Sequence, residues 1–269
     1  MKTYDIYCDA SVGSNLRGAC AGALVTERMG QTSYMEACIQ PDGTNNSGEV
    51  CAILLGVTNA IKIMETSSEE CRFNIFSDSI IGIRGVREWI FHWIANANKN
   101  GNNVFVNSSG EPVANQVYFK LIFNNVILRD LDVHFYHQRG HVTGRYEACA
   151  YNFMQTNGIN LMRLGLTAEK ISLYNNHVDN ITREILRTYL KNNTLTMDGV
   201  SFDRMANTEL EAAMASGIAI PTIDMVSTPS LQYNQEFAIL EGKQIVKKYA
   251  TLIHASDYPS RYRIAKYIS

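Results

Sequence analysis

The first 165 residues alternate strand and helix patterns in an order that few folds can accommodate. Residues 4–8 alternate side chains with the period of two that is typical of a strand, and two similar segments follow after short polar turns. Three strands joined in this way predict an antiparallel meander, after which helical and strand patterns alternate. The predicted strands are 4–8, 21–26, 32–38, 73–76 and 133–136, and the predicted helices are 50–64, 80–97, 114–128 and 145–156. This order predicts an α/β fold with a five-stranded mixed sheet flanked by helices.

After residue 164 the patterns become mainly helical. Apolar residues from Ile171 to Tyr189 recur every three or four positions, and residues 236–253 predict a further helix. Pro221 and Pro229 bracket a stretch typical of a linker. We therefore divide the chain into an α/β domain over residues 1–160 and a mainly helical C-terminal extension over 165–269. The extension has no indicated role, so a homodimer and a protein partner bound through its helices both stay open.

Composition excludes several classes of protein. The chain has 24 basic and 26 acidic residues, so net charge alone does not make it a nucleic-acid-binding polycation. Its six cysteines form no C-x-x-C pair and lie mostly in apolar patterns, which favours buried thiols in a reducing cytoplasm over a disulfide framework. Apolar runs of the length that a membrane span needs are not evident, and the first five residues do not open a signal peptide. We expect a cytoplasmic protein with no membrane partner.

Acidic residues stand at the ends of two predicted strands and at the start of a helix. Asp9 ends the first strand, Asp78 ends the fourth, and Glu49 begins the first helix. If the two strands are neighbours, the three carboxylates converge, and each raises the pKa of the others unless a cation is present. Oxygen ligands favour Mg²⁺ or Mn²⁺, and two such ions can activate a water and stabilise the leaving oxygen of a phosphodiester. The competing interpretation is local, with each aspartate a turn or cap residue, and Asn46 and Glu49 a capping box.

Five segments resemble the type 1 ribonuclease H family, and together they span about residues 3–156. Residues 4–11 (YDIYCDAS) resemble its first strand, in which an aspartate precedes Gly or Ala and then Ser. Residues 44–52 (TNNSGEVCA) resemble its T-N-N-x-x-E-x-x-A segment, and residues 76–79 (FSDS) its T-D-S. Residues 86–93 (VREWIFHW) are similar to its helix with two tryptophans four apart, and residues 138–142 (QRGHV) to its K-G-H loop.

The resemblance implies an endonuclease that hydrolyses the RNA strand of RNA/DNA hybrids with two Mg²⁺ ions, for which Mn²⁺ can substitute. The products would carry a 5′-phosphate and a 3′-hydroxyl. Trp89 and Trp93 would face the DNA strand, although two aromatic residues one turn apart are also typical of a core. The remaining residues carry implied roles as follows: Asp9, Glu49 and Asp78 hold the metal ions, His141 moves a proton or helps product leave, and Asn15, Asn45 and Asn46 contact the hybrid.

The chain departs from the family at the fourth acidic position. The family carries an A-D-x-L-A segment about ten residues after the loop histidine, where this chain has Tyr151 and then Asn152. We predict Asn152 as the fourth metal ligand through its carbonyl oxygen, with Glu147 as the nearest carboxylate. A neutral ligand would weaken the second metal site. The alternatives are a non-catalytic nucleic-acid-binding or assembly protein with the same fold, and a related DNA nuclease such as a resolvase. The Asn45–Asn46 pair favours RNA over DNA.

Overall fold

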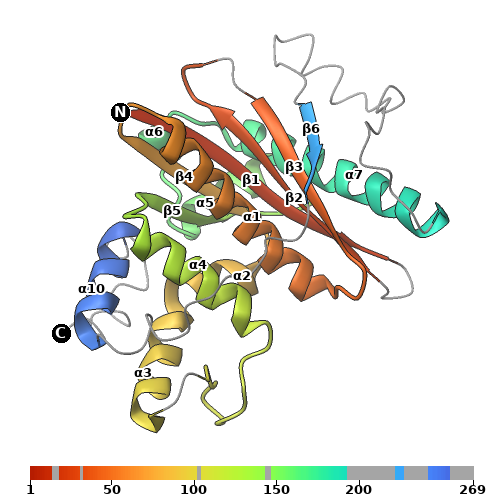
Figure 1. The fold of residues 1–269 in the computed structure, drawn as a ribbon. Coiled ribbons are helices and arrows are strands. Elements are labelled where there is room, and N and C mark those ends of the chain that lie inside the picture. Colours follow the sequence, from red (N-terminus) through yellow and green to blue (C-terminus); the bar gives the residue numbers. More distant parts are fainter. Residues whose placement is uncertain are drawn as a thin grey trace.

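The computed structural model describes residues 1–13, 18–30, 33–101, 104–142, 147–192, 222–226 and 242–254 (Figure 1). In this part of the chain the strands form one mixed sheet with the order β5-β4-β1-β2-β3-β6. The meander is antiparallel, whereas β4, β5 and β6 each pair in parallel with their neighbours. The strands are β1 (Lys2–Val12), β2 (Ala19–Glu27), β3 (Ser33–Gln40), β4 (Cys71–Ser77), β5 (Val133–His137) and β6 (Thr222–Met225).

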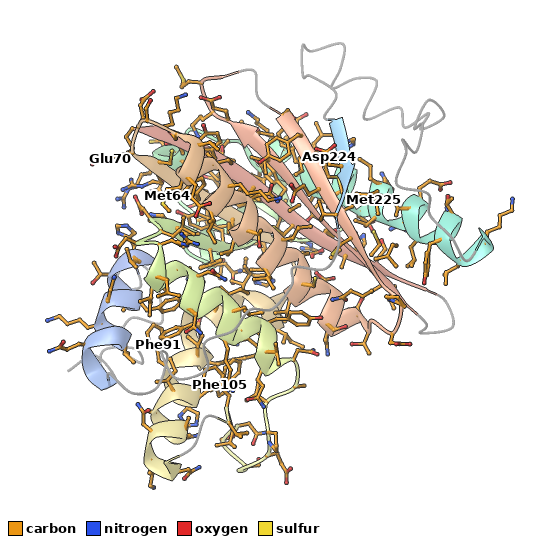
Figure 2. All side chains as sticks on the ribbon, in the orientation of Figure 1. Met64, Glu70, Phe91, Phe105, Asp224 and Met225 are labelled. Carbon is orange, nitrogen blue, oxygen red and sulfur yellow. The ribbon has the colours of Figure 1, made fainter. Side chains whose placement is uncertain are left out.

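The predicted five strands are confirmed, and β6 adds a sixth that the sequence did not predict. It lies inside the stretch bracketed by Pro221 and Pro229, which the sequence indicated as a linker. Four residues are too few to show a reliable period of two. The strand pairs in parallel with β3, with Glu36 opposite Asp224, at the edge where Figure 2 labels Asp224 and Met225.

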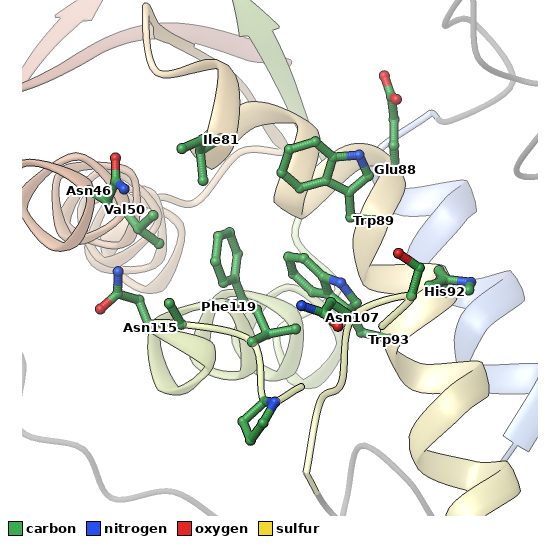
Figure 3. A pocket seen from close by; sticks show the side chains of 14 residues that line it. Asn46, Val50, Ile81, Glu88, Trp89, His92, Trp93, Asn107, Asn115 and Phe119 are labelled. Carbon is green, nitrogen blue, oxygen red and sulfur yellow. The ribbon is translucent and has the colours of Figure 1, made fainter. Parts of the chain in front are cut away.

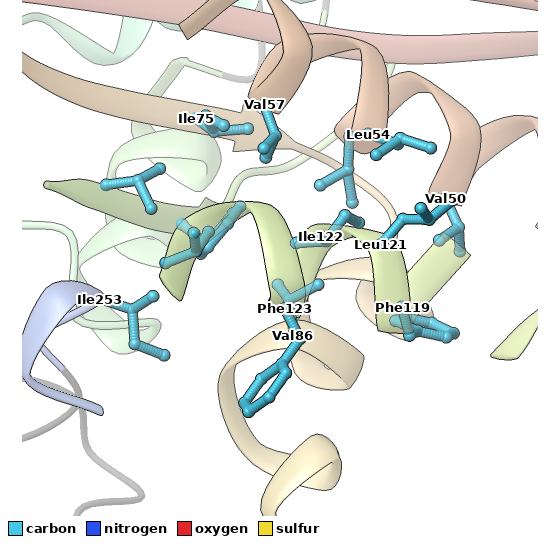
Figure 4. Close-up of a cluster of buried hydrophobic side chains, with 14 of the residues drawn as sticks. Val50, Leu54, Val57, Ile75, Val86, Phe119, Leu121, Ile122, Phe123 and Ile253 are labelled. Atoms are coloured by element: carbon cyan, nitrogen blue, oxygen red, sulfur yellow. The ribbon is translucent and has the colours of Figure 1, made fainter. Parts of the chain in front are cut away.

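Helices cover both faces of the sheet, and each face has its own apolar core (Figure 1). Alternation along β1 sends Ile6 and Cys8 to one face and Tyr7 to the other. On the Ile6 face, Val50 and Leu54 lie toward Leu121 and Ile122 in the apolar core (Figure 4). That face carries α1 (Asn45–Thr66), α2 (Ile80–Arg84), the π-helical turn η1 (Gly85–Trp89), α3 (Ile90–Asn100), α4 (Gln116–Leu128) and α10 (Gly242–Leu252).

The long helix α1 begins differently from the capping box that the sequence suggested. Thr44 is the N-cap, its hydroxyl accepts the Ser47 backbone N–H at 3.2 Å, and the Ser47 hydroxyl accepts the Thr44 N–H at 2.8 Å. The Asn46–Glu49 capping box is therefore wrong, and the Glu49 carboxylate is left for other contacts. By length and composition alone α1 is apolar enough to cross a membrane, which the sequence analysis did not anticipate, but 72% of its most apolar window is buried in the protein.

The second face is covered by α5 (Glu147–Thr156), α6 (Leu161–Leu164) and α7 (Ala168–Asn192). The apolar stripe of α7 packs on β1 and β2, with Ile171, Val178 and Ile185 buried. At Gly22 of β2 a Cβ would lie 2.6 Å from Thr182 Cγ2, so glycine permits this close approach. Both α7 and β6 lie beyond residue 165, yet they complete the sheet and the core of this face.

Candidate active site

The three predicted acidic residues converge at one edge of the sheet. In the parallel pair β1–β4, Cys8 lies opposite Ser77, the last residue of β4. Asp9 does not end its strand as predicted, because β1 continues to Val12 paired with β2, but it lies next to Asp78, the first residue after β4. The second turn of α1 brings Glu49 to the same point. One carboxylate oxygen from each of the three lies within 4.8 Å of the others. The predicted convergence is confirmed.

Among the residues that the structure describes, Asp9 Oδ2 and Glu49 Oε2 of this cluster are buried without a hydrogen-bond partner. The other oxygen of Asp9 accepts the Ala10 backbone N–H at 2.7 Å. Leaving a buried carboxylate oxygen unpaired is unfavourable, and a divalent cation is the partner that three converging carboxylates suit best. The residues present therefore fit a hard, oxygen-preferring metal ion.

Burial and mutual repulsion make these acids bind protons more tightly than usual. Burial raises the pKa of Asp9 well above its ordinary value, and the charges of Asp78 and Glu49 raise it further. Burial likewise raises the pKa of Glu49, with Asp78 adding to the effect. The pKa of Asp78 is raised mainly by burial, although His141 and the Asn175 amide oppose the shift. A bound cation would favour the ionised forms and reverse these shifts.

A fourth carboxylate, which the sequence analysis missed, reaches the site from α7. Asp179 is 7% exposed, and its charge adds to the effect of burial in raising the pKa of Asp9, Glu49 and Asp78. Its Oδ2 lies 3.5 Å from His141 Nδ1 and also pairs with Arg183 one turn along.

Asn175, one turn before Asp179, is fully buried and accepts a hydrogen bond from the Gln138 amide. It faces Asp78 from the same side of α7 as Asp179. The signal in the sequence is a row of polar residues, Asn175, Asp179 and Thr182, spaced by four and three beside the apolar stripe. Such a row on a core-packing helix points to a buried polar site, but it does not say which part of the sheet the helix crosses.

The loop after β5 places His141 at the rim of the site. Its ring is 73% exposed, and its backbone φ is 51°, in the left-handed region. Gly140 lies against Asp78, since a Cβ there would be 1.8 Å from Asp78 Oδ2. His137 supports the same residue from inside, with Nε2 3.1 Å from the Asp78 carbonyl oxygen. An exposed imidazole beside the half-buried Asp78 and the buried Asp179 can exchange protons between the site and solvent.

The structure does not bring every predicted ligand to the cluster. Asn152 lies on α5 with an exposed side chain, whereas Asp179 is buried and its charge raises the pKa of the other three acids. Glu147 opens α5, and its side chain lies outside the described part, as does the whole of Asn15. Among the residues predicted to contact the hybrid, Asn45 and Asn46 are exposed at the start of α1.

Asn46, Trp89 and Trp93 line one pocket of about 630 Å³ between α1, α3 and α4 (Figure 3). Trp93 is 6% exposed and packs edge-on against Phe119 with ring centroids 5.0 Å apart. Trp89 lies at the wall of the pocket and is less buried. The tryptophan pair is therefore both a core element and the lining of an open cavity.

Comparison with known proteins agrees with this geometry. A model of the RNase H family matches residues 1–154, which is more than half of the chain. The chain belongs to the RNase H family. Ribonuclease HI of Haemophilus influenzae strain KW20 is 30% identical over 115 residues, covering 43% of this chain and 64% of the relative. Ribonuclease H of H. influenzae strain 86-028NP is 30% identical over 119 residues, with the same coverage. This RNase H-family chain thus matches less than two thirds of the length of these relatives.

Solved structures with a similar fold include two RNase H1 proteins and a viral enzyme. LC9-RNase H1 shares 18% identity, with a TM-score of 0.40, over 58% of this chain and 72% of its own. LC11-RNase H1 in complex with an RNA/DNA hybrid shares 18%, with a TM-score of 0.37, over 57% and 94%. The foamy viral protease–reverse transcriptase in complex with an RNA/DNA hybrid shares 15%, with a TM-score of 0.41, over 68% and 19%. The carboxylate cluster of this RNase H-family chain lies within residues 1–154, whereas Asp179 lies beyond them.

Proposed function

We propose that this chain is an endoribonuclease that hydrolyses the RNA strand of RNA/DNA hybrids by two-metal-ion catalysis. The observation that carries the proposal is the cluster of Asp9, Glu49 and Asp78, with two buried carboxylate oxygens that accept no hydrogen bond from the described part of the chain. Membership of the RNase H family supports the reaction class. The products would be a 5′-phosphate and a 3′-hydroxyl.

The four acids would hold Mg²⁺, with Mn²⁺ as a substitute, and Asp179 would take the role that the sequence analysis gave to Asn152. When bound, the ions would supply an activated water and stabilise the leaving oxygen. Asp179 suits this role because it is a buried carboxylate that interacts electrostatically with the other three. A charged ligand also removes the reason to expect a weak second metal site.

His141 would move the proton. Its Nδ1 faces Asp179, which orients the ring, and its exposed edge can deliver a proton to the leaving oxygen or release one to solvent. Gly140 holds this loop against Asp78. Both contacts tie the position of the imidazole to that of the acids.

Two surfaces flanking the acids would hold the hybrid. On one side, Asn46, Trp89 and Trp93 line the 630 Å³ pocket, where aromatic faces can pack against the DNA strand. On the other, a pocket of about 490 Å³ is lined by Ser11 and His141 and by Arg183 and Arg187 of α7. Asp179 also lines this pocket and pairs with Arg183, so Arg187 is the guanidinium group that would contact phosphates of the strand that is cut.

The deciding experiment is cleavage of a labelled RNA/DNA hybrid in Mg²⁺ and in Mn²⁺ by the wild-type, Asp179→Asn and Asn152→Ala chains. We expect hybrid-selective cleavage that falls at least 100-fold in Asp179→Asn and is unchanged in Asn152→Ala. The opposite ranking of the two variants would return the fourth ligand position to Asn152. Cleavage of duplex DNA instead of the hybrid would favour the DNA nuclease. A folded chain that binds the hybrid and cuts nothing would favour the non-catalytic alternative.

A further inference from the structure

A second cluster of metal-binding side chains lies at the opposite end of β5 from the acids. Asp132 precedes β5, His134 is its second residue, and His254 follows α10. One ligand atom from each lies within 4.8 Å of the others. His134 stands three residues before His137, or roughly 10 Å along the strand, so the cluster is separate from the active site.

Two of the distances within the cluster are close to those between ligands of a transition-metal ion. Asp132 Oδ1 lies 2.9 Å from His254 Nε2 and 3.7 Å from His134 Nε2. Ligands about 2 Å from a tetrahedral zinc ion are about 3.3 Å from one another, which lies between these two values. Two imidazoles and one carboxylate are a donor set that favours Zn²⁺ over Mg²⁺ or Ca²⁺. A water would complete the coordination.

The surroundings hold the ligands in place. Arg72 Nε donates a hydrogen bond to Asp132 Oδ2 at 2.9 Å. The remaining oxygen, Oδ1, is therefore the one directed at the two histidines. Hydrogen bonds of this kind to a ligating carboxylate are usual around metal sites. His134 is buried in the sheet, whereas the His254 side chain is 36% exposed. The cluster thus combines a fixed ligand, an oriented carboxylate and one movable ligand.

The two imidazole rings are stacked, with centroids 4.3 Å apart and planes 9° apart. Lone pairs of parallel rings do not meet at one point, so metal binding requires one ring to turn. His254 is the ring that can turn, because it is partly exposed and follows the last turn of α10.

We propose that Asp132, His134 and His254 form a zinc site that fastens the end of α10 to the edge of the sheet. The helix already docks there through apolar residues, the Lys248–Asp130 ion pair and a hydrogen bond from the Tyr249 hydroxyl to the Val86 carbonyl oxygen. Zinc would add a link between residues more than a hundred positions apart. Its binding would stabilise the folded chain without changing the acids at the other edge.

The test is zinc titration of the full chain, stripped with EDTA, in an Asp9→Asn background that removes the acidic site as a competitor. We expect binding of one Zn²⁺ per chain and a rise in Tm with zinc. Adding His254→Ala or the isosteric Asp132→Asn should weaken binding at least tenfold. The control His92→Ala removes an imidazole elsewhere and should leave the affinity unchanged.

Cobalt provides an independent readout, because a tetrahedral site with nitrogen and oxygen ligands gives visible absorption bands, which should disappear in His254→Ala. Circular dichroism before titration confirms that each variant is folded. Equal zinc affinity in the Asp9→Asn chain and in both ligand variants would overturn the proposal, and the cluster would then be an ion pair between Asp132 and His254. The outcome does not depend on whether the chain cleaves a hybrid.

Discussion

Replacing Asp9 by asparagine should abolish cleavage and stabilise the metal-free protein. Asp9 is 4% exposed, its Oδ2 has no hydrogen-bond partner within the described ranges, and oxygens of Glu49 and Asp78 lie within 4.8 Å. Asparagine keeps an oxygen to accept the Ala10 N–H and places an amide donor where Oδ2 stood. The variant therefore exchanges repulsion between carboxylates for hydrogen bonds to them.

The magnitude follows from these distances. Two unit charges 4.8 Å apart repel by about 3.5 kcal/mol at an effective dielectric constant of about 20. Protonation limits this penalty, because neutralising a carboxyl group of ordinary pKa at neutral pH costs about 4 kcal/mol. After relaxation we expect a gain of about 2 kcal/mol in the free energy of unfolding. For a chain of this size that corresponds to a rise in Tm of about 4–8 °C.

The gain should depend on pH in a definite direction. The pKa of Asp9 is raised, so the folded chain binds its proton more tightly than the unfolded chain does. Binding this proton therefore stabilises the folded chain. The stabilisation is complete below about pH 4 and is lost as the pH rises through the raised pKa of Asp9. The variant should melt near the wild-type temperature at pH 4 and above it at pH 8.

Thermal unfolding followed by circular dichroism in EDTA, from pH 4 to pH 8, measures this difference. The control Asp42→Asn removes an exposed acid in the turn after β3 and should leave the Tm within about 1 °C. Adding Mg²⁺ should raise the Tm of the wild-type chain and not that of Asp9→Asn. A variant that melts at or below the wild-type temperature at pH 8 in EDTA would refute the repulsion argument.

Three further predictions follow from particular contacts. Gly140→Ala should lower the rate of cleavage of a labelled hybrid roughly 100-fold, because the new Cβ would displace Asp78. Unchanged cleavage would show that the loop moves without displacing Asp78. Burial lowers the pKa of His177 to about 4, so the stability of the wild-type chain should fall as the pH is lowered from about 6.5 to 4. His177→Leu should flatten this part of the profile of Tm against pH, and an equal slope in the two chains would contradict the prediction. Arg187→Gln should reduce the slope of log affinity for the hybrid against log salt concentration by about one. The control Arg129→Gln, just after α4, should leave this slope unchanged. Equal slopes for the wild-type and Arg187→Gln chains would remove Arg187 from the interface.

Patterns between near neighbours in the chain were enough to predict most of the sheet and the acidic cluster. Alternation along residues 4–8 and 73–76 indicated two strands, and each is followed by an aspartate. Parallel pairing sets Cys8 opposite Ser77, so Asp9 and Asp78 had to lie side by side once β1 and β4 were neighbours, although β1 itself continues to Val12. The helix start was predicted less well, because Thr44, Asn46 and Ser47 are all residues that cap helices, and only the backbone geometry selects Thr44.

Contacts between distant segments depended on tertiary structure. The apolar stripe of α7 predicts a helix that packs on a core, but not where that helix crosses the sheet. The crossing over β1 and β2 brings Asp179 to the acids, whereas the sequence analysis sought the fourth ligand on α5, at Asn152. The pairing of β6 with β3 and the meeting of His254 with Asp132 join residues more than a hundred positions apart. Periodicity reports the local backbone and the face that is buried, whereas the partner of that face is decided only when the whole core packs.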